Sequence, residues 1–135
     1  NSSVPAITIV IGASYGAGNY GMCGRAYEPR FLFSWPNSKC SVMGPDQLAG
    51  VLDIVLRGAA ERAGRKVNEE MAEAQKSMMK QMVEDTSSVY YTSSRCIDDG
   101  IIDPRDTRSV IGICLSVIYS ELVQGGNLYG VSRMQ

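Results

Sequence analysis

The sequence of 135 residues predicts an α/β fold from three observations. Short apolar runs, which suit buried strands, alternate with longer segments in which apolar residues recur at helical spacing. A glycine-rich turn, Gly12–Gly21, stands between the first apolar run and a predicted helix. The composition, 44% hydrophobic and 20% charged residues, is that of an ordinary globular protein. At 135 residues, the chain forms one domain or part of one.

Four short apolar runs predict the strands. Ile7–Ile11 suits a strand buried on both faces. Tyr20–Tyr27 is rich in small residues and predicts a short helix that packs close to neighbouring backbone. Arg30–Trp35 predicts a second strand, Ser41–Met43 a third and very short one, and Ile101–Ile102 a further buried strand.

A long helix is predicted from Pro45, because proline suits the first helical position, with Gly64 as its C-cap. Its charged face carries Asp53, Arg57 and Glu61. Its apolar face repeats at i, i+3, i+4 spacing through Leu48, Val51, Leu52, Val55, Leu56 and Ala59.

A second helix is predicted over Val67–Glu84, with an apolar stripe formed by Val67, Met71, Ala74, Met78 and Met82. Packing of this stripe against the rest of the domain is favoured over an adaptable, methionine-rich binding surface. The lysines of the segment suit a solvated outer face.

The last third predicts a short helical turn in Ser87–Arg95 and then a long helix. Asp103 is the predicted N-cap of that helix, and Pro104 occupies its first position. Gly125-Gly126 ends it, and its apolar face consists of Val110, Ile111, Cys114, Val117, Ile118 and Leu122.

Charge and composition exclude several classes of function. A net charge of −1 and a pI near 5.4 argue against nucleic-acid binding, which needs a basic face. No apolar run approaches the length of about 20 residues that a membrane span requires. Asn1–Pro5 do not resemble a signal peptide, lack a start methionine and lead at once into a strand, so we expect a fragment of a longer protein.

The four cysteines, Cys23, Cys40, Cys96 and Cys114, are widely spaced, and the chain has no histidine. This pattern argues against a zinc site and favours reduced thiols of an intracellular protein over disulfides. It also removes Ser-His and Cys-His nucleophiles. Chemistry here must use backbone dipoles, carboxylates or a ligand's own groups.

Gly16, Gly18 and Gly21 form a literal G-x-G-x-x-G, the pattern of dinucleotide-binding turns. That class is excluded, because four residues separate the strand from the first glycine and Phe31–Lys39 holds no acidic ribose ligand. A P-loop is excluded because no Gly-Lys-Ser/Thr follows. Two interpretations stay open: amides aimed at a developing negative charge, or glycines that only permit tight packing.

Four segments resemble the carboxyltransferase (β) subunits of methylcrotonoyl-CoA carboxylases, within the biotin-dependent acyl-CoA carboxyltransferase family. They are Ile9–Tyr27, Phe33–Asn37, Ser41–Gly44 and Asp98–Arg108. The resemblance implies a crotonase-like fold, of the ClpP/crotonase superfamily, in which residues 1–135 are the later, C-terminal part of the second of two such domains. Arg65–Asp85 is the least family-like stretch.

The resemblance also implies a site. The backbone amides of Ala17 and Gly18 would stabilise negative charge on the biotin oxygen, and Tyr15, Gly16, Asn19 and Tyr20 would complete the biotin-binding turn. Biotin itself would take the substrate's proton, so no side-chain base is needed. No metal is expected in this chain. Tyr20 stands where propionyl- and acetyl-CoA relatives carry an acidic residue, which favours the methylcrotonoyl branch.

The expected partners follow from the same resemblance. They are a biotin carboxylase/biotin carrier α subunit, further copies of the carboxyltransferase subunit in a homo-oligomer, and 3-methylcrotonoyl-CoA from leucine degradation. The expected compartment is the mitochondrial matrix in a eukaryote and otherwise the cytoplasm. Alternatives are a propionyl-, geranoyl- or other acyl-CoA carboxyltransferase, or an assembly and biotin-docking module without activity of its own.

Overall fold

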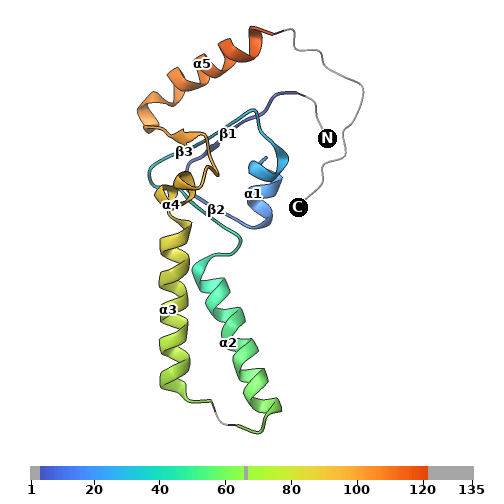
Figure 1. Cartoon of the computed structure of the whole chain (residues 1–135), viewed down its shortest axis with the longest axis vertical. Coiled ribbons are helices and arrows are strands. Elements are labelled where there is room, and N and C mark those ends of the chain that lie inside the picture. The colour runs from blue at the N-terminus through green and yellow to red at the C-terminus, as the bar shows by residue number, and fades with distance from the viewer. Residues whose placement is uncertain (1–3, 66, 122–135) are drawn as a thin grey trace.

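The computed structural model describes residues 4–65 and 67–121. Figure 1 shows a body that holds the strands and a hairpin of two long helices that extends from it. The hairpin helices are α2 (Pro45–Arg62) and α3 (Glu69–Ser87), and the helices of the body are α1 (Ala17–Gly21), α4 (Val89–Ser94) and α5 (Thr107–Tyr119).

The strands pair in parallel within two small sheets, which confirms the predicted α/β class. One sheet has the order β1-β3-β5, and the other pairs β2 with β4. Ile7 lies opposite Phe31, and Ala13 lies opposite Lys39. The strands are β1 (Ile7–Val10), β2 (Ala13–Tyr15), β3 (Phe31–Ser34), β4 (Lys39–Ser41) and β5 (Gly100–Ile101).

Strand β4 lies two residues earlier than predicted. The apolar pattern placed a strand at Ser41–Met43, but pairing with β2 puts it at Lys39–Ser41, and Val42 beyond it is 82% exposed. The pattern missed β2 because its three residues lie inside the glycine-rich segment. The segment therefore begins as a strand and becomes a turn at Gly16.

The predicted helix at Tyr20–Tyr27 is wrong as one element. Helix α1 begins earlier, at Ala17, and ends at Gly21, and a 3-10 turn, η1 (Arg25–Tyr27), follows it. Between them Cys23 has a left-handed backbone, with φ of 58°, which interrupts helical hydrogen bonding. The break redirects the chain into β3.

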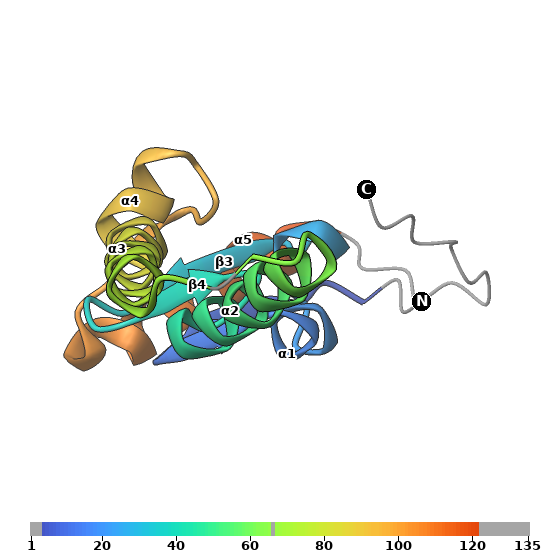
Figure 2. The same cartoon turned by 90° about the horizontal axis from the view of Figure 1, so that it is seen from below.

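Helix α2 has nearly the predicted ends, since it starts at Pro45 and is followed by Gly64 in a left-handed conformation, with φ of 62°. Its predicted apolar face is partly open to solvent, because Val51, Val55 and Leu56 are each more than 40% exposed. Of its residues, Ala49 is buried. The helix packs chiefly against α3 (Figure 2), which covers one side of it.

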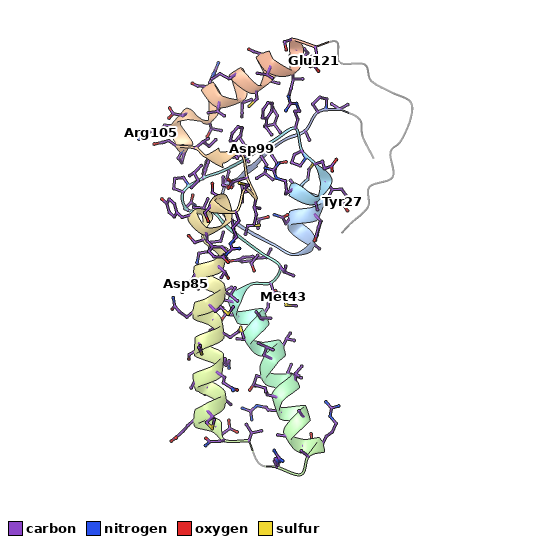
Figure 3. All side chains as sticks on the ribbon, in the orientation of Figure 1. Tyr27, Met43, Asp85, Asp99, Arg105 and Glu121 are labelled. Carbon is purple, nitrogen blue, oxygen red and sulfur yellow. The ribbon has the colours of Figure 1, made fainter. Side chains whose placement is uncertain are left out.

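Helix α3 begins after Asn68, whose side chain accepts hydrogen bonds from the amides of Glu70 and Met71. The prediction that its methionine stripe packs against the domain is wrong in this chain. Met71, Met78 and Met82 are 63%, 77% and 60% exposed, and Figure 3 shows side chains projecting from the sides of the hairpin. The buried residues of α3 are Ala72, Val83 and Ser87.

The segment after the hairpin matches its prediction closely. Helix α4 confirms the helical turn in Ser87–Arg95. Asp103 accepts a hydrogen bond from the Arg105 amide at 2.8 Å and caps a 3-10 turn, η2 (Pro104–Asp106), which leads into α5. Cys114 is the buried residue of α5. Leu122 and the predicted helix end at Gly125-Gly126 lie outside the described residues.

Candidate functional site

The turn between β2 and α1 depends on Gly16. This residue has φ of 55° and ψ of −130°, a backbone conformation that residues with side chains rarely adopt. A Cβ at this position would lie 2.9 Å from the carbonyl oxygen of Val42. The Gly16 amide donates to the Ser41 carbonyl at 3.1 Å, so the turn is fixed against the end of β4.

Immediately after Gly16, the amides of Ala17 and Gly18 have no hydrogen-bond acceptor within residues 4–65 and 67–121. As the first two residues of α1 they have no intrahelical acceptor, whereas the next two amides, of Asn19 and Tyr20, both donate to the Gly16 carbonyl. Ala17 and Gly18 are also exposed. The turn therefore presents two adjacent free N–H donors to its surroundings.

Most glycines of the turn are not required by packing. A Cβ at Gly12, Gly18 or Gly21 would meet no described atom within 4 Å. Gly24 is the exception after the turn, since its Cβ would lie 1.9 Å from the Asn19 Oδ1 atom. The interpretation that these glycines only permit tight packing thus accounts for Gly16 and Gly24 but not for Gly18.

The remaining predicted site residues surround the two amides in different ways. Tyr15 is half-buried and its ring lies against Gly44. Tyr20 is 38% exposed and packs edge-on against Tyr27, with ring centroids 6.1 Å apart. Asn19 is turned into the body, where it donates to Ser14 and Cys40.

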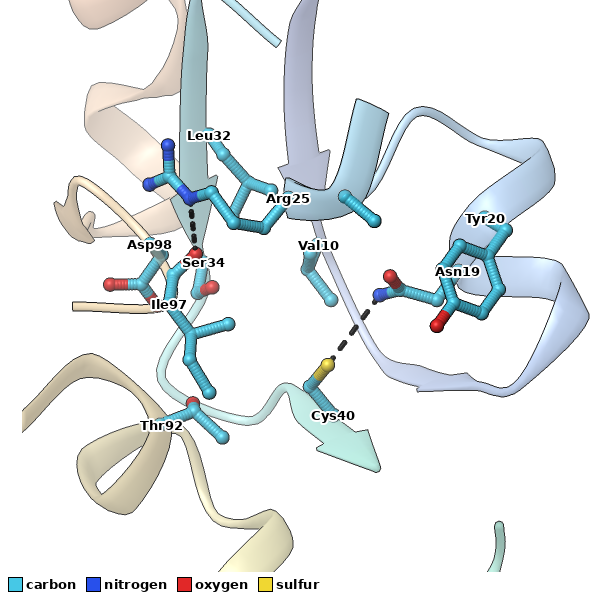
Figure 4. Close-up of a pocket in the computed structure, with 11 residues that line it drawn as sticks. Val10, Asn19, Tyr20, Arg25, Leu32, Ser34, Cys40, Thr92, Ile97 and Asp98 are labelled. Carbon is cyan, nitrogen blue, oxygen red and sulfur yellow. Dashed lines mark hydrogen bonds between the residues drawn. The ribbon is translucent and has the colours of Figure 1, made fainter. Parts of the chain in front are cut away.

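Behind α1 lies a cavity of about 180 Å³, which Figure 4 shows in close-up. Asn19 and Tyr20 form its wall on the side of the predicted site. Its other lining residues are Val10, Arg25, Ala26, Leu32, Ser34, Cys40, Thr92, Ile97 and Asp98. The cavity therefore joins the glycine turn to the segment before β5.

Two groups at this cavity are unusual. Both carboxylate oxygens of Asp98 are buried and have no hydrogen-bond partner in the described part of the chain. Burial, together with the charge of Asp98, raises the pKa of the Cys40 thiol above its ordinary value. Cys40 is therefore a protonated thiol at neutral pH rather than a nucleophilic thiolate.

Asp99, the next residue in the chain, accepts hydrogen bonds with both of its carboxylate oxygens. Its carboxylate accepts from the Arg25 guanidinium at 2.8 Å and from the Leu32 amide at 2.7 Å. Arg25 Nε also donates to the Ile97 carbonyl at 2.8 Å. Although burial opposes ionisation, these donors hold the pKa of Asp99 below its ordinary value. The pair thus connects η1 with the central strand β3 and with the turn before β5.

Asp99→Asn should lower the melting temperature of the chain by roughly 3–6 °C at pH 7, because it removes a carboxylate that two donors hold. Since the pKa of Asp99 is lowered on folding, its contribution is present above about pH 4 and is lost as the pH falls below that value. The difference between wild type and variant should therefore shrink in acid, as thermal unfolding at pH 3 and pH 7 will show.

Asp98→Asn is the matched control, because the Asp98 oxygens have no partner to lose. It should leave the melting temperature at pH 7 unchanged or higher. Equal losses for both variants at all pH values would contradict the assignment of the Arg25–Asp99 pair.

The described residues form neither a metal-binding cluster nor a membrane-spanning helix. No group of three or more Cys, Asp or Glu side chains is placed to hold a metal ion within the part of the chain described. Among the same residues, no helix combines the length and the hydropathy that crossing a membrane requires. All four cysteines are free thiols.

Fold and site together define a class of protein: an α/β domain whose strand-to-helix turn presents two adjacent backbone N–H groups that have no acceptor in the described part of the chain. A comparison with protein families then identifies the family to which the chain belongs. Residues 1–127 match the model of the carboxyl transferase domain, and the chain belongs to that family. The predicted family resemblance and its crotonase-like fold are confirmed.

Several relatives of the chain are named as β subunits of carboxylases. It is 53% identical, over 99% of its length, to a probable biotin-dependent acyl-coenzyme A carboxylase beta2 subunit of Mycobacterium tuberculosis. It is 47% identical, over 98% of its length, to the mitochondrial methylcrotonoyl-CoA carboxylase beta chain of Arabidopsis thaliana. The chain spans 25% and 22% of these relatives, about a quarter of their length.

A solved structure gives the same assignment. The crystal structure of the β subunit of Pseudomonas aeruginosa geranyl-CoA carboxylase matches 96% of this chain and 24% of that one, with a TM-score of 0.77 and 39% sequence identity. The elements described above thus correspond to about a quarter of that β subunit.

Several residues of the site were missed by the sequence pattern. Arg25 and Asp99 are 74 positions apart, and their pairing leaves no local signal in the sequence. Cys40 was considered for its redox state and not for its place at the cavity. The inward direction of Asn19 could be found only from the fold.

Proposed function

We propose that this chain supplies the biotin-side half of a carboxyltransferase active site. The observation that carries the proposal is the pair of free, adjacent amides at Ala17 and Gly18 in a chain of the carboxyl transferase family. Biotin, when bound, brings the carboxyl group, and its ureido oxygen gains negative charge as that group leaves. The two N–H groups would stabilise this charge, and they suit the task because no acceptor in residues 4–65 and 67–121 competes for them.

Under this proposal the chain's other residues shape the turn rather than transfer protons. Gly16 sets the direction of the two amides, and Gly18 lets a ligand approach the backbone closely. Tyr15 and Tyr20 would flank the bound ring, with Tyr20 held by its edge-on contact with Tyr27. Cys40, a protonated thiol, would not act as a nucleophile.

The chain is proposed to be the C-terminal part, residues 1–135, of the second crotonase-like domain of a longer subunit. Its length, about a quarter of that of its relatives, supports this. The exposed apolar residues of α2, α3 and α5 suit contacts with further parts of the subunit or with other copies in a homo-oligomer. The proposed partner is a biotin carboxylase/biotin carrier α subunit, in the mitochondrial matrix of a eukaryote or otherwise in the cytoplasm.

The proposed acyl substrate is 3-methylcrotonoyl-CoA. The name of the Arabidopsis relative and the aromatic residue at Tyr20 support it, and the geranyl-CoA carboxylase structure supports a longer acyl chain as the alternative. The test supplies the longer subunit with carboxybiotin on its carrier and measures kcat/KM for 3-methylcrotonoyl-, geranoyl- and propionyl-CoA. The highest value is expected for 3-methylcrotonoyl-CoA, and absence of transfer to all three would contradict the function itself.

A second candidate is an assembly and biotin-docking module. It is favoured by one observation, that the chain corresponds to about a quarter of its relatives and so carries one part of their machinery. Such a module would bind the biotin carrier or another subunit without catalysing transfer.

A further inference from the structure

The side chain of Asn19 faces away from the solvent side of the turn. Its Nδ2 group donates to the Ser14 hydroxyl at 3.0 Å. The same group donates to the Cys40 sulfur at 3.5 Å, as Figure 4 shows. Ser14 belongs to β2 and Cys40 to β4, so one amide group bridges both strands of the small sheet. Asn19 directly follows Gly18, the second of the two free amides.

The backbone of Asn19 is fixed as well. Its N–H donates to the Gly16 carbonyl at 3.1 Å, and its own carbonyl accepts from the Gly24 amide at 2.8 Å. Gly24 is buried and has no room for a Cβ, because the Asn19 side chain fills that space. Asn19 therefore joins three segments: the strand before the helix, the helix itself and the turn after it.

Helix α1 has few other anchors. It has five residues, none of them buried, and its Gly16 N-cap makes no side-chain hydrogen bond to it. A helix this short is not stable by its own hydrogen bonds, so its orientation depends on contacts to the body. Among the described residues, the Asn19 side chain provides polar contacts of α1 with both β2 and β4.

We propose that Asn19 is a positioning residue, which holds α1 against β2 and β4 and so fixes the direction of the Ala17 and Gly18 amides. The inference rests on the proposed function only for its effect on catalysis. It differs from the role that the family resemblance implies, in which Asn19 is part of the biotin-binding turn. Here the residue acts from beneath the turn and its side chain does not contact the ligand.

The first test measures the amides themselves in the full 135-residue chain labelled with ¹⁵N. In wild type, NMR relaxation should give order parameters for Ala17 and Gly18 near 0.85, and Asn19→Ala should lower them below about 0.6. Asn37→Ala is the matched control, because Asn37 donates to the Ile11 carbonyl from a neighbouring exposed turn. It should leave both order parameters unchanged.

A second variant keeps the inference testable if Asn19→Ala does not fold. Ser14→Ala combined with Cys40→Ala leaves Asn19 in place and removes both acceptors of its side chain. The same fall in the two order parameters is expected. Unchanged values in a folded Asn19→Ala chain, or in the double variant, would overturn the inference.

The last test separates positioning from the proposed function. In the longer subunit, Asn19→Ala should lower kcat by about 10- to 100-fold, as expected for donors displaced by about 1 Å, with little change in KM for the biotin carrier. A raised KM with rigid amides would mean that Asn19 contacts biotin and would overturn the inference. Mobile amides with an unchanged kcat would support positioning and contradict the role of the amides in transfer.

Discussion

The chain on its own is expected to transfer no carboxyl group from biotin to an acyl-CoA. It carries one pair of candidate oxyanion donors, and we propose that the donors for the thioester oxygen of the acyl-CoA lie in another domain of the longer subunit. Because one such donor is worth roughly 3 kcal/mol, loss of a whole pair together with the CoA site should abolish turnover. The chain's length, about a quarter of that of its relatives, agrees with this expectation.

The measurement is carboxylation of 3-methylcrotonoyl-CoA by the purified chain, with the longer subunit as the positive control. The preparation must be free of the host's own biotin-dependent carboxylases, which mass spectrometry can verify. Turnover by the chain above the rate without protein would contradict the half-site account, because both oxyanion positions would then lie within these residues.

Ala17→Pro in the longer subunit should lower kcat by about two to three powers of ten. Proline has no N–H, so the variant removes one of the two free donors, and loss of a single oxyanion donor has an effect of this size. Proline at the first helical position is otherwise well tolerated, so α1 should persist. Ala17→Gly keeps the N–H and should be nearly neutral.

Two glycine variants separate chemistry from folding in this prediction. Gly18→Ala should fold normally, because its Cβ meets no described atom within 4 Å, and should lower activity only if a ligand approaches there. Gly16→Ala should disturb the turn itself, because of its positive φ and its contact with Val42. Circular dichroism and melting temperature, measured beside kcat, show which effect applies. Loss of folding in step with loss of rate for Ala17→Pro would support a purely structural role.

Local sequence patterns predict much of the fold. Pro45, Gly64, Asp103 and Pro104 lie at helix boundaries close to those predicted, since caps act through the first and last turns of a helix. The strand β2 could not be predicted in the same way, because its three residues carry no alternating pattern and its pairing with β4 is set by the fold.

The faces of the helices were less predictable than their ends. The apolar residues of α2 and the methionines of α3 have the spacing of a buried stripe, yet they are exposed in this chain. Periodicity identifies a surface that is to be covered, but not what covers it. The contacts around the turn could not be predicted from the sequence either, because those of Asn19 and of the Arg25–Asp99 pair join positions that are remote in sequence.

The claim that backbone N–H groups do the chemistry is tested most directly by replacing the amide of Ala17 with an ester. Substituting L-lactate for Ala17 in the longer subunit deletes the N–H and keeps the methyl group and the backbone shape. We predict a fall in kcat of about two to three powers of ten with little change in melting temperature. An unchanged kcat in the folded ester variant would contradict the account.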